Sequence, residues 1–324
     1  MKLILFIVAI LANKASTAAN FDSAYLAFIG SSYNDYKLLR NGLNFSKVIS
    51  VNYFNASRPS VFILHGWRDG FREAIGKELV EAYLHRNDCN IIVGDWSFYS
   101  WNHNYVALAE SVPRLALTFL NYLYKIKETG YDLTRIHFVG HSLGAHVLGG
   151  IGEMLKADNI FIPRITGLDP AGPTFNAKNV FEIFAILLKI PSNSGLQRGN
   201  ARFVDVIHTD AGLTGTTASI GDLDFWPNGG SKQPSCKRCP SANGDKGMDC
   251  VGCNHRTSWL YFAESVRSSM PLFMSLRCPD GVTGYTEKKC KGPEIASMGY
   301  HGDVTSKRGN YYLRTNAAAP FSRS

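Results

Sequence analysis

Residues 140–144 read Gly-His-Ser-Leu-Gly, a Gly-x-Ser-x-Gly spacing that could hold a nucleophilic serine. An apolar strand is expected over 136–140 and a helix over 145–156, so Ser142 would occupy a tight turn between them. Such a turn needs Gly140 and Gly144 because the adjacent backbones pass close together. The hydroxyl would project above the sheet, and the helix N-terminus would offer free N–H groups to an oxyanion. The pattern predicts a nucleophile elbow of a hydrolase.

A serine nucleophile also needs an acid that orients its base. Asp169 follows the next expected strand, 165–168, and lies 27 residues after Ser142. That spacing leaves room for one crossover helix, and in this arrangement the acid comes after the serine and the histidine last. The alternative is a loop aspartate that caps a turn. The spacing favours Asp169 as the acid.

Three histidines, His208, His255 and His301, lie after Asp169 and could be the base. His208 is inside a strand-like stretch, which favours a structural hydrogen bond. His255 follows Cys253 on a loop that a disulfide could hold in place, ahead of a helix expected near Thr257. A general base must be held within hydrogen-bond reach of the nucleophile. We therefore favour His255, with His301 as the second choice.

Two backbone N–H groups are candidates for an oxyanion hole. Leu143 follows the serine, and Trp67 ends the turn after the expected strand 61–64. Trp67 could equally be a packing aromatic, because its proposed role belongs to its backbone. We expect the amides of Trp67 and Leu143 to bind the developing negative charge.

The elements that must position these residues alternate between strand and helix. Further strands are expected over 91–93 and 203–207, and helices over 71–85 and 104–127, the latter interrupted by Pro113. Strands that alternate with helices indicate an α/β fold with a mostly parallel central sheet covered by helices on both faces. Active-site residues in such sheets gather at the carboxyl ends of the strands.

The first residues resemble a targeting segment. Lys2 precedes a short apolar run over 3–11, and small residues follow at 16–18, which predicts a signal peptide over 1–18. The run is shorter than the roughly 20 residues that span a bilayer, and no later segment is suitable. We expect a secreted, extracellular chain with one catalytic domain over 19–324, and nothing demands more than a monomer.

The formal net charge is +8, and the basic residues are scattered apart from a cluster at 288–291. This cluster is either a solvated face or a site of weak attraction to anionic lipid. No segment resembles a nucleic-acid-binding module.

Cysteines are concentrated in the C-terminal third. In a secreted chain they indicate disulfides, although two Cys-x-x-Cys pairs also have the spacing of a zinc site. Cys89 has no evident partner. Asn44 and Asn55 begin glycosylation sequons, which agrees with export. The six clustered cysteines are Cys236, Cys239, Cys250, Cys253, Cys278 and Cys290.

Taken together, the motifs resemble the pancreatic-lipase family of secreted lipases and phospholipases A1, over residues 25–315, and are most similar to its insect members. The resemblance implies an α/β-hydrolase fold, Ser142, Asp169 and His255 as a catalytic triad, and Trp67 and Leu143 as the oxyanion hole. The matching stretches are Leu64-His-Gly-Trp67, Gly94-Asp-Trp96, Gly140-His-Ser-Leu-Gly-Ala-His146, Gly167-Leu-Asp-Pro-Ala-Gly-Pro173, Phe203-Val-Asp-Val-Ile-His-Thr-Asp210, Asp224-Phe-Trp-Pro-Asn-Gly-Gly230 and Cys253-Asn-His255.

The resemblance also implies a disulfide-bounded lid from Cys236 to Cys253, with an internal bridge between Cys239 and Cys250. This lid and a second surface loop, 211–221, are both short. Short loops uncover the site for polar head groups, which favours phospholipase A1 activity over neutral triacylglycerol lipase activity.

Three features depart from the family pattern. Asp222 stands where relatives usually carry histidine. The carboxylates of a calcium loop are replaced by Gln197 and Asn200, which are poor ligands for a hard cation, so no metal and no cofactor is expected. A longer stretch before 203 contains the apolar segment 180–190. That segment is a core helix, an exposed lipid contact or an incorrectly joined coding segment.

The leading functional hypothesis is a serine ester hydrolase that acts on glycerolipids or phospholipids at a lipid–water interface. A lipid-binding or storage protein on an inactive lipase scaffold is the second hypothesis. A peptidase or small-ester esterase on the same fold is the third. Retention of Ser142, Asp169 and His255 favours the enzyme.

Overall fold

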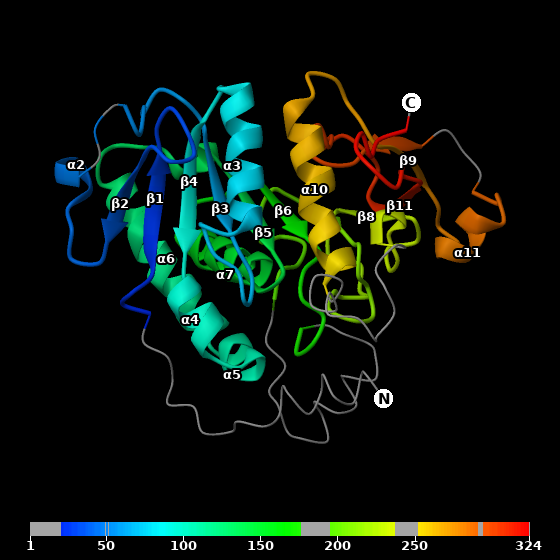
Figure 1. The fold of residues 1–324 in the computed structure, drawn as a ribbon, viewed down its shortest axis with the longest axis horizontal. Helices are drawn as coiled ribbons and strands as arrows, with labels where there is room; N and C mark the ends of the chain where they lie inside the picture. Colours follow the sequence, from blue (N-terminus) through cyan, green and yellow to red (C-terminus); the bar gives the residue numbers. More distant parts are fainter. Residues whose placement is uncertain are drawn as a thin grey trace.

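The computed structural model describes residues 21–48, 50, 52–175, 195–236, 252–290 and 294–323. An 11-stranded sheet runs through it in the order β10-β9-β11-β8-β7-β6-β5-β3-β4-β1-β2 (Figure 1). The predicted signal peptide, the apolar segment 180–190, Cys239 and Cys250 lie outside the described residues.

The middle of the sheet is parallel, as the alternating pattern predicts. Neighbouring strands pair in parallel from β4 through to β8, and β11 extends the run beside β8. Every residue of β3, β4, β7 and β8 is buried, which is expected when helices cover both faces of a parallel sheet. The parallel strands are β3 (Ser60–Leu64), β4 (Asn90–Asp95), β5 (Ile136–His141), β6 (Arg164–Leu168), β7 (Phe203–Ile207), β8 (Leu223–Pro227) and β11 (Gly309–Leu313).

Antiparallel strands extend the sheet at both ends, and the sequence analysis did not predict them. At one end, β1 (Tyr25–Ile29) pairs with β4 and β2 (Tyr36–Arg40) pairs with β1. At the other end, β9 (Met274–Arg277) pairs with β11 and β10 (Ile295–Ser297) pairs with β9.

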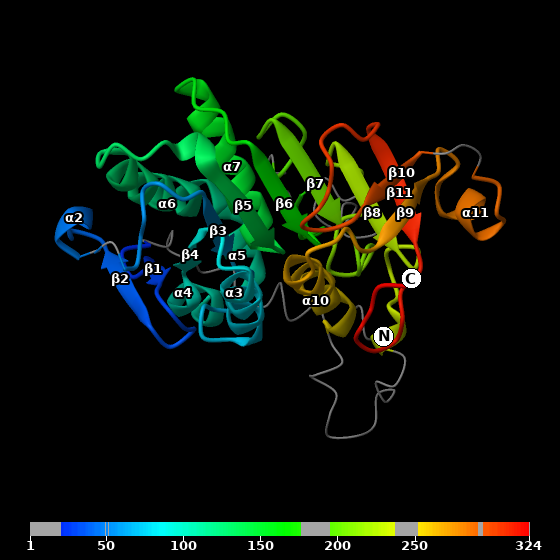
Figure 2. The ribbon, with the colours of Figure 1, turned by 90° about the horizontal axis from the view of Figure 1, so that it is seen from above.

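Helices form one layer on each face of the sheet, as Figure 2 shows. On one face, α6 (Val112–Lys127) packs against α7 (Leu143–Ala157). On the other face, α3 (Ala74–Arg86) packs against α10 (Cys253–Arg267). Two large hydrophobic clusters fill the spaces between the sheet and these layers. Within the described residues, no helix is long and apolar enough to cross a membrane.

Two expected helices differ from the prediction. The helix expected over 104–127 is split into α5 (Tyr105–Glu110) and α6 at Ser111. Pro113 lies in the first turn of α6, where its missing N–H is not needed. The last long helix, α10, begins at Cys253 and not near Thr257, and Gly252, with φ of 86°, is the residue that precedes it.

Shorter elements connect the layers. The helix α4 follows β4 closely and was not predicted; the others lie in the connections between longer elements. They are α2 (Phe45–Val48), α4 (Ser97–Asn102), α11 (Gly281–Thr286) and the 3-10 turns η1 (Leu133–Arg135) and η2 (Pro234–Cys236).

Among the residues that the structure describes, two disulfides are formed, Cys236–Cys253 and Cys278–Cys290. Because the sulfurs of Cys236 and Cys253 are bonded to each other, the alternative of a four-cysteine zinc site is wrong. Cys89 is a free, partly buried thiol.

Candidate active site

Ser142 lies at the point where β5 turns into α7. Its backbone has φ of 54° and ψ of −123°, a region that is essentially reserved for glycine and that marks a strained position. Its N–H donates to the Leu168 carbonyl at 3.1 Å, and its carbonyl accepts from the Ala145 N–H at 3.2 Å. These bonds hold the strained turn between the neighbouring strand β6 and the first turn of the helix.

The glycines around Ser142 are required by close approach. A Cβ at Gly140 would lie 2.7 Å from Ala145 Cα, and one at Gly144 would lie 2.4 Å from the His65 carbonyl oxygen. A Cβ at Gly66 would lie 2.7 Å from Ser142 Cβ. The elbow and the 65–67 turn therefore pack backbone against backbone.

The turn that carries Trp67 is held by His65, a role that the sequence analysis missed. The His65 Nδ1–H donates to the Gly66 carbonyl at 2.9 Å, while Nε2 accepts from the Trp96 N–H at 3.1 Å. Its ring stacks on Trp96, and burial lowers the pKa of His65, so the imidazole is neutral. Leu143 is the first residue of α7, and its N–H is one of those without a partner inside the helix.

Asp169 follows β6 and is completely buried. Its Oδ1 accepts from the backbone N–H groups of Thr209 at 2.7 Å and Asp210 at 3.1 Å. Its Oδ2 accepts from His255 Nδ1 at 2.5 Å. The carboxylate is therefore fixed on one side by the loop that follows β7 and bonded to the imidazole on the other.

His255 is the third residue of α10, in its first turn and not on a preceding loop as expected. The Cys236–Cys253 disulfide anchors the helix two residues earlier. Burial alone would lower the pKa of His255, but the hydrogen bond to Asp169 and the charges of Asp169, Asp210 and Asp69 together raise it.

Two further carboxylates that sequence reasoning missed face this histidine. Burial, followed by the charge of Asp169, raises the pKa of Asp210 to about 6. Burial raises the pKa of Asp69 to about 7. Asp69 Oδ2 lies 3.9 Å from Nδ1 of His141, and the His141 ring lies 4.4 Å from the His255 ring, centroid to centroid. Asp210 is buried and Asp69 is partly buried, and only the fold could bring both beside the partly buried imidazole of His255.

Asp169, Asp210 and His255 bring their polar atoms within 4.8 Å of one another, close enough for a metal ion. Several of these atoms already have partners within the protein. Both oxygens of Asp169 accept hydrogen bonds, and Asp210 Oδ2 accepts from the Thr214 hydroxyl at 2.5 Å. The cluster fits an acid–base site better than a cation site.

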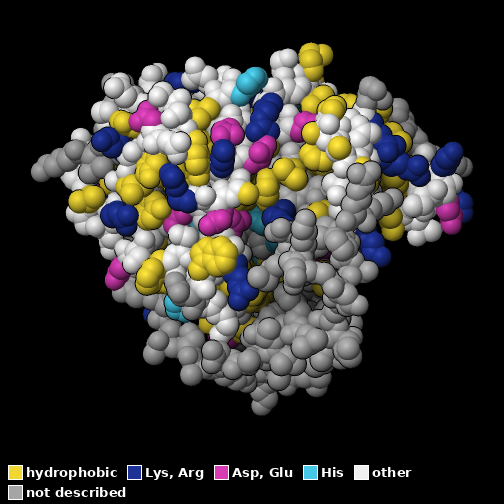
Figure 3. All heavy atoms as spheres, viewed as in Figure 1, with side chains coloured by type: hydrophobic (Ala, Val, Ile, Leu, Met, Phe, Trp, Pro, Cys, Tyr) yellow, Lys and Arg dark blue, Asp and Glu magenta, His cyan; other side chains and the backbone are white. Residues whose placement is uncertain are grey.

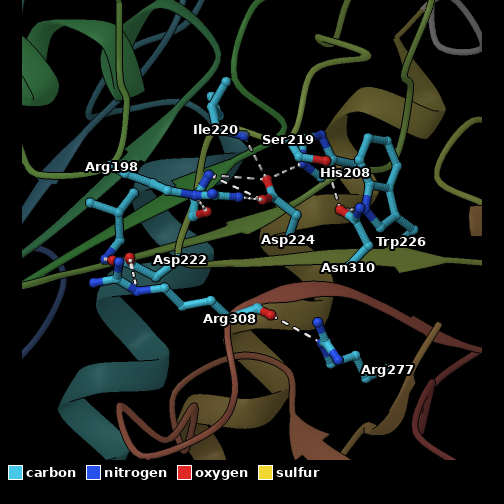
Figure 4. A network of polar contacts seen from close by, with 12 residues as sticks. Arg198, His208, Ser219, Ile220, Asp222, Asp224, Trp226, Arg277, Arg308 and Asn310 are labelled. Atoms are coloured by element: carbon cyan, nitrogen blue, oxygen red, sulfur yellow. Dashed lines mark hydrogen bonds and ion pairs between the residues drawn. The ribbon is translucent and has the colours of Figure 1, made fainter. Parts of the chain in front are cut away.

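The other two histidines lie elsewhere. His208 Nε2 is 2.9 Å from Asp224 Oδ1, and the ring stacks on Trp226 with centroids 3.8 Å apart (Figure 4). His301 Nε2 is 2.9 Å from the Ser268 carbonyl oxygen, beyond the far end of α10. Of the three candidate bases, the fold brings only His255 to Asp169.

Figure 4 also shows the contacts of Asp222, the residue that departs from the family pattern. Asp222 Oδ2 accepts from the Val204 N–H at 2.9 Å, and Oδ1 pairs with Arg308 Nε at 3.0 Å. Its backbone carbonyl accepts from the Gly309 N–H at 3.0 Å. The side chain therefore joins β7 to the start of β11 and has a structural role.

The loop that carries Gln197 and Asn200 in place of calcium-binding carboxylates is closed by the side-chain amide of Asn200. Asn200 Oδ1 accepts from the Gln197 N–H at 2.8 Å, and Asn200 Nδ2 donates to Glu153 Oε2 at 3.0 Å. Asn200 is buried, so these bonds satisfy a side chain that has left water. These contacts hold the loop to its own backbone and to α7.

Comparison with known proteins gives consistent matches. A family model described as Lipase matches residues 8–321. Lipase member H of Danio rerio is 30% identical over 294 residues, which cover 87% of this chain and 60% of that protein.

Two further relatives are similar. Pancreatic triacylglycerol lipase of Myocastor coypus is 28% identical over 326 residues, covering 94% of this chain and 67% of that protein. Phospholipase A1 member A of Rattus norvegicus is 30% identical over 279 residues, covering 83% and 57%. The chain spans about 60% of the length of the first relatives it matches.

Proposed function

Because this chain belongs to the lipase family, we propose that it is a carboxylic ester hydrolase in which Ser142, His255 and Asp169 act as a triad. The family resemblance of its motifs is confirmed, and its mostly parallel sheet with helices on both faces is that of an α/β-hydrolase. The observation that carries the proposal is the 2.5 Å bond between His255 and Asp169 at the same edge of the sheet as the elbow.

The expected mechanism uses two displacements. Since His255 Nδ1–H donates to Asp169, Nε2 is the unprotonated nitrogen and can take the Ser142 proton as Oγ attacks the ester carbonyl. The tetrahedral oxyanion would be bound by the amides of Leu143 and Trp67. His255 then gives its proton to the leaving alcohol, and water releases the fatty acid by the same steps.

We propose a glycerolipid as substrate, with a phospholipid preferred over a triacylglycerol. One similar protein is named a triacylglycerol lipase and another a phospholipase A1, so these names do not decide between the two substrates. The compactness of loop 211–221 supports the phospholipid. Isolated bridges join Gly215 to Ala171 and to Ala211, so the loop folds back on itself beside Asp169. An open site would admit a polar head group.

The deciding experiment measures fatty-acid release from phosphatidylcholine and from triolein by the full chain and its Ser142→Ala variant, with and without calcium. Release that disappears in Ser142→Ala supports the triad, and the faster substrate decides the specificity. If the wild type and Ser142→Ala are folded and equally inactive on both lipids, the proposed lipid hydrolase is wrong, and a lipid-binding scaffold becomes the favoured hypothesis.

We also propose that the chain is secreted and glycosylated. Two disulfides favour an oxidising compartment. Asn44 is exposed, and its Oδ1 accepts from the Ser46 hydroxyl at 2.7 Å; Asn55 and Ser57 make the same contact at 2.7 Å. A glycosidase-sensitive mass that is lost in Asn44→Gln/Asn55→Gln protein recovered from culture medium is the expected result. Retention inside the cell would contradict it.

A further inference from the structure

Two large aromatic side chains are exposed on α4, the short helix after β4. Phe98 is 59% exposed and Trp101 is 51% exposed. They are three residues apart and so lie on one face of the helix. Hydrophobic side chains are visible over α4 in Figure 3, beside Lys and Arg side chains. Single exposed apolar residues need no explanation, but an aromatic pair on one helix face does.

We propose that Phe98 and Trp101, together with Arg68, form a lipid-contact surface, called here the α4 surface, which inserts into a phospholipid interface and places Ser142 against it. This inference rests on the proposed function, because it names how a lipid substrate in an aggregate is approached. It assigns a binding role to residues outside the triad and outside the oxyanion hole.

The α4 surface is tied to the catalytic serine by a short series of contacts. The Arg68 N–H donates to the Ser100 carbonyl at 3.2 Å, and the Ser100 hydroxyl donates to the Asp69 carbonyl at 2.7 Å. Trp67 Nε1–H donates to the His103 carbonyl at 3.1 Å. The same turn continues into Gly66, which packs on Ser142. Binding at α4 would therefore hold the oxyanion turn and the serine at the lipid.

The chemistry of the α4 surface fits a phospholipid. Tryptophan is enriched at the head-group level of membranes, because its ring is apolar and its N–H is polar. Arg68 is exposed at φ of 53°, and its guanidinium carbon lies 4.8 Å from the Trp67 ring centroid. An exposed guanidinium binds phosphate through paired N–H donors. The formal net charge of +8 adds attraction to anionic lipid.

The test measures binding of the Ser142→Ala protein to vesicles by co-sedimentation, so that hydrolysis does not change the lipid. Vesicles of phosphatidylcholine alone and of phosphatidylcholine with phosphatidylglycerol are compared. The added Phe98→Ser/Trp101→Ser change should weaken partitioning at least about tenfold, since two large apolar groups no longer leave water. Arg68→Gln should weaken binding more on the anionic vesicles.

Met270→Ser is the matched control. Met270 is 67% exposed and apolar, but it follows the far end of α10, whereas His255 lies at the beginning of that helix. It should leave partitioning unchanged. A second readout is fluorescence: Trp96, Trp226 and Trp259 are buried and Trp67 is partly buried, so a blue shift on vesicle binding should come from Trp101. The shift should disappear in Trp101→Phe.

Each outcome decides one point. Unchanged partitioning in folded Phe98→Ser/Trp101→Ser protein, or an equal loss in Met270→Ser, would overturn the α4 surface. If the Ser142→Ala protein does not bind vesicles while the wild type hydrolyses a soluble short-chain ester, the α4 surface is overturned too, and the ester hydrolase stands. If Phe98→Ser/Trp101→Ser selectively weakens vesicle binding while the wild type has no esterase activity, the α4 surface is supported and the enzyme is rejected. When Phe98→Ser/Trp101→Ser is made in the active wild-type chain, the rate of hydrolysis of vesicle lipid should fall relative to that of a soluble ester.

Discussion

Asp169 Oδ2 and His255 Nδ1 are 2.5 Å apart although 86 residues separate them in sequence. The contact joins the end of β6 to the first turn of α10, two elements that meet only in the folded chain. Replacing Asp169 with asparagine would keep the shape but present an amide N–H to the ring, which favours the wrong tautomer. We expect Asp169→Asn to lower kcat about a thousandfold or more with little change in KM. Equal kcat would show that another group orients His255.

The acidic limb of the pH profile should depend on Asp210. His255 must be neutral to accept the serine proton, so activity falls as pH drops through the pKa of this histidine. The charges of Asp169, Asp210 and Asp69 favour the imidazolium and raise that pKa. Asp210→Asn removes one negative charge, lowers the pKa of His255 and should move the acidic limb of kcat/KM toward lower pH. A limb that stays in place, or moves to higher pH, would contradict this electrostatic account.

The elbow should tolerate no side chain at Gly144. Its Cβ would lie 2.4 Å from the His65 carbonyl oxygen, whereas a Cβ at Gly150 on the same helix would meet only Ala116 Cβ, at 3.2 Å. Gly144→Ala should reduce the free energy of unfolding by about 1–3 kcal/mol and abolish activity. Gly150→Ala should stay within about 1 kcal/mol of the wild type, since alanine favours helix. Denaturant unfolding compares them, and equal losses would rule out the steric explanation.

The two disulfides should differ in their effect on activity. Cys236–Cys253 anchors α10 beside His255, while Cys278–Cys290 packs with Trp226 and Tyr312 at the other end of the sheet. Replacing either pair with serine should lower stability by about 2–4 kcal/mol.

Only Cys236→Ser/Cys253→Ser should also lower kcat on a soluble ester at a temperature where both variants remain folded. Circular dichroism establishes that temperature. A larger kcat loss in Cys278→Ser/Cys290→Ser would show that the anchoring argument is mistaken.

Calcium removal should leave the fold unchanged. Asn200 satisfies its amide with Gln197 and Glu153, so the loop has partners without an ion. The melting temperature in EDTA and in millimolar calcium should therefore agree. Asn200→Asp would place a carboxylate against Glu153 and should lower the melting temperature in EDTA. A wild-type chain that melts earlier in EDTA would indicate a cation site.

Local sequence was sufficient for the elbow and for the parallel centre of the sheet. Both follow from short-range sterics and from strand–helix alternation, and the structure agrees at Gly140, Ser142 and Gly144. It was insufficient for the antiparallel strands at both ends, because β1 joins the sheet through β4 and β9 joins it through β11, partners that are distant in the chain.

The sequence by itself determined which residues could carry the chemistry: a strained serine, an acid after the next strand and three possible bases. Only the tertiary structure decided that His255 meets Asp169, that Asp69 and Asp210 surround it, and that Asp222 binds Arg308. The reason is physical. Backbone geometry is set by neighbours along the chain, whereas burial, charge environment and long-range hydrogen bonds exist only once distant elements have packed together.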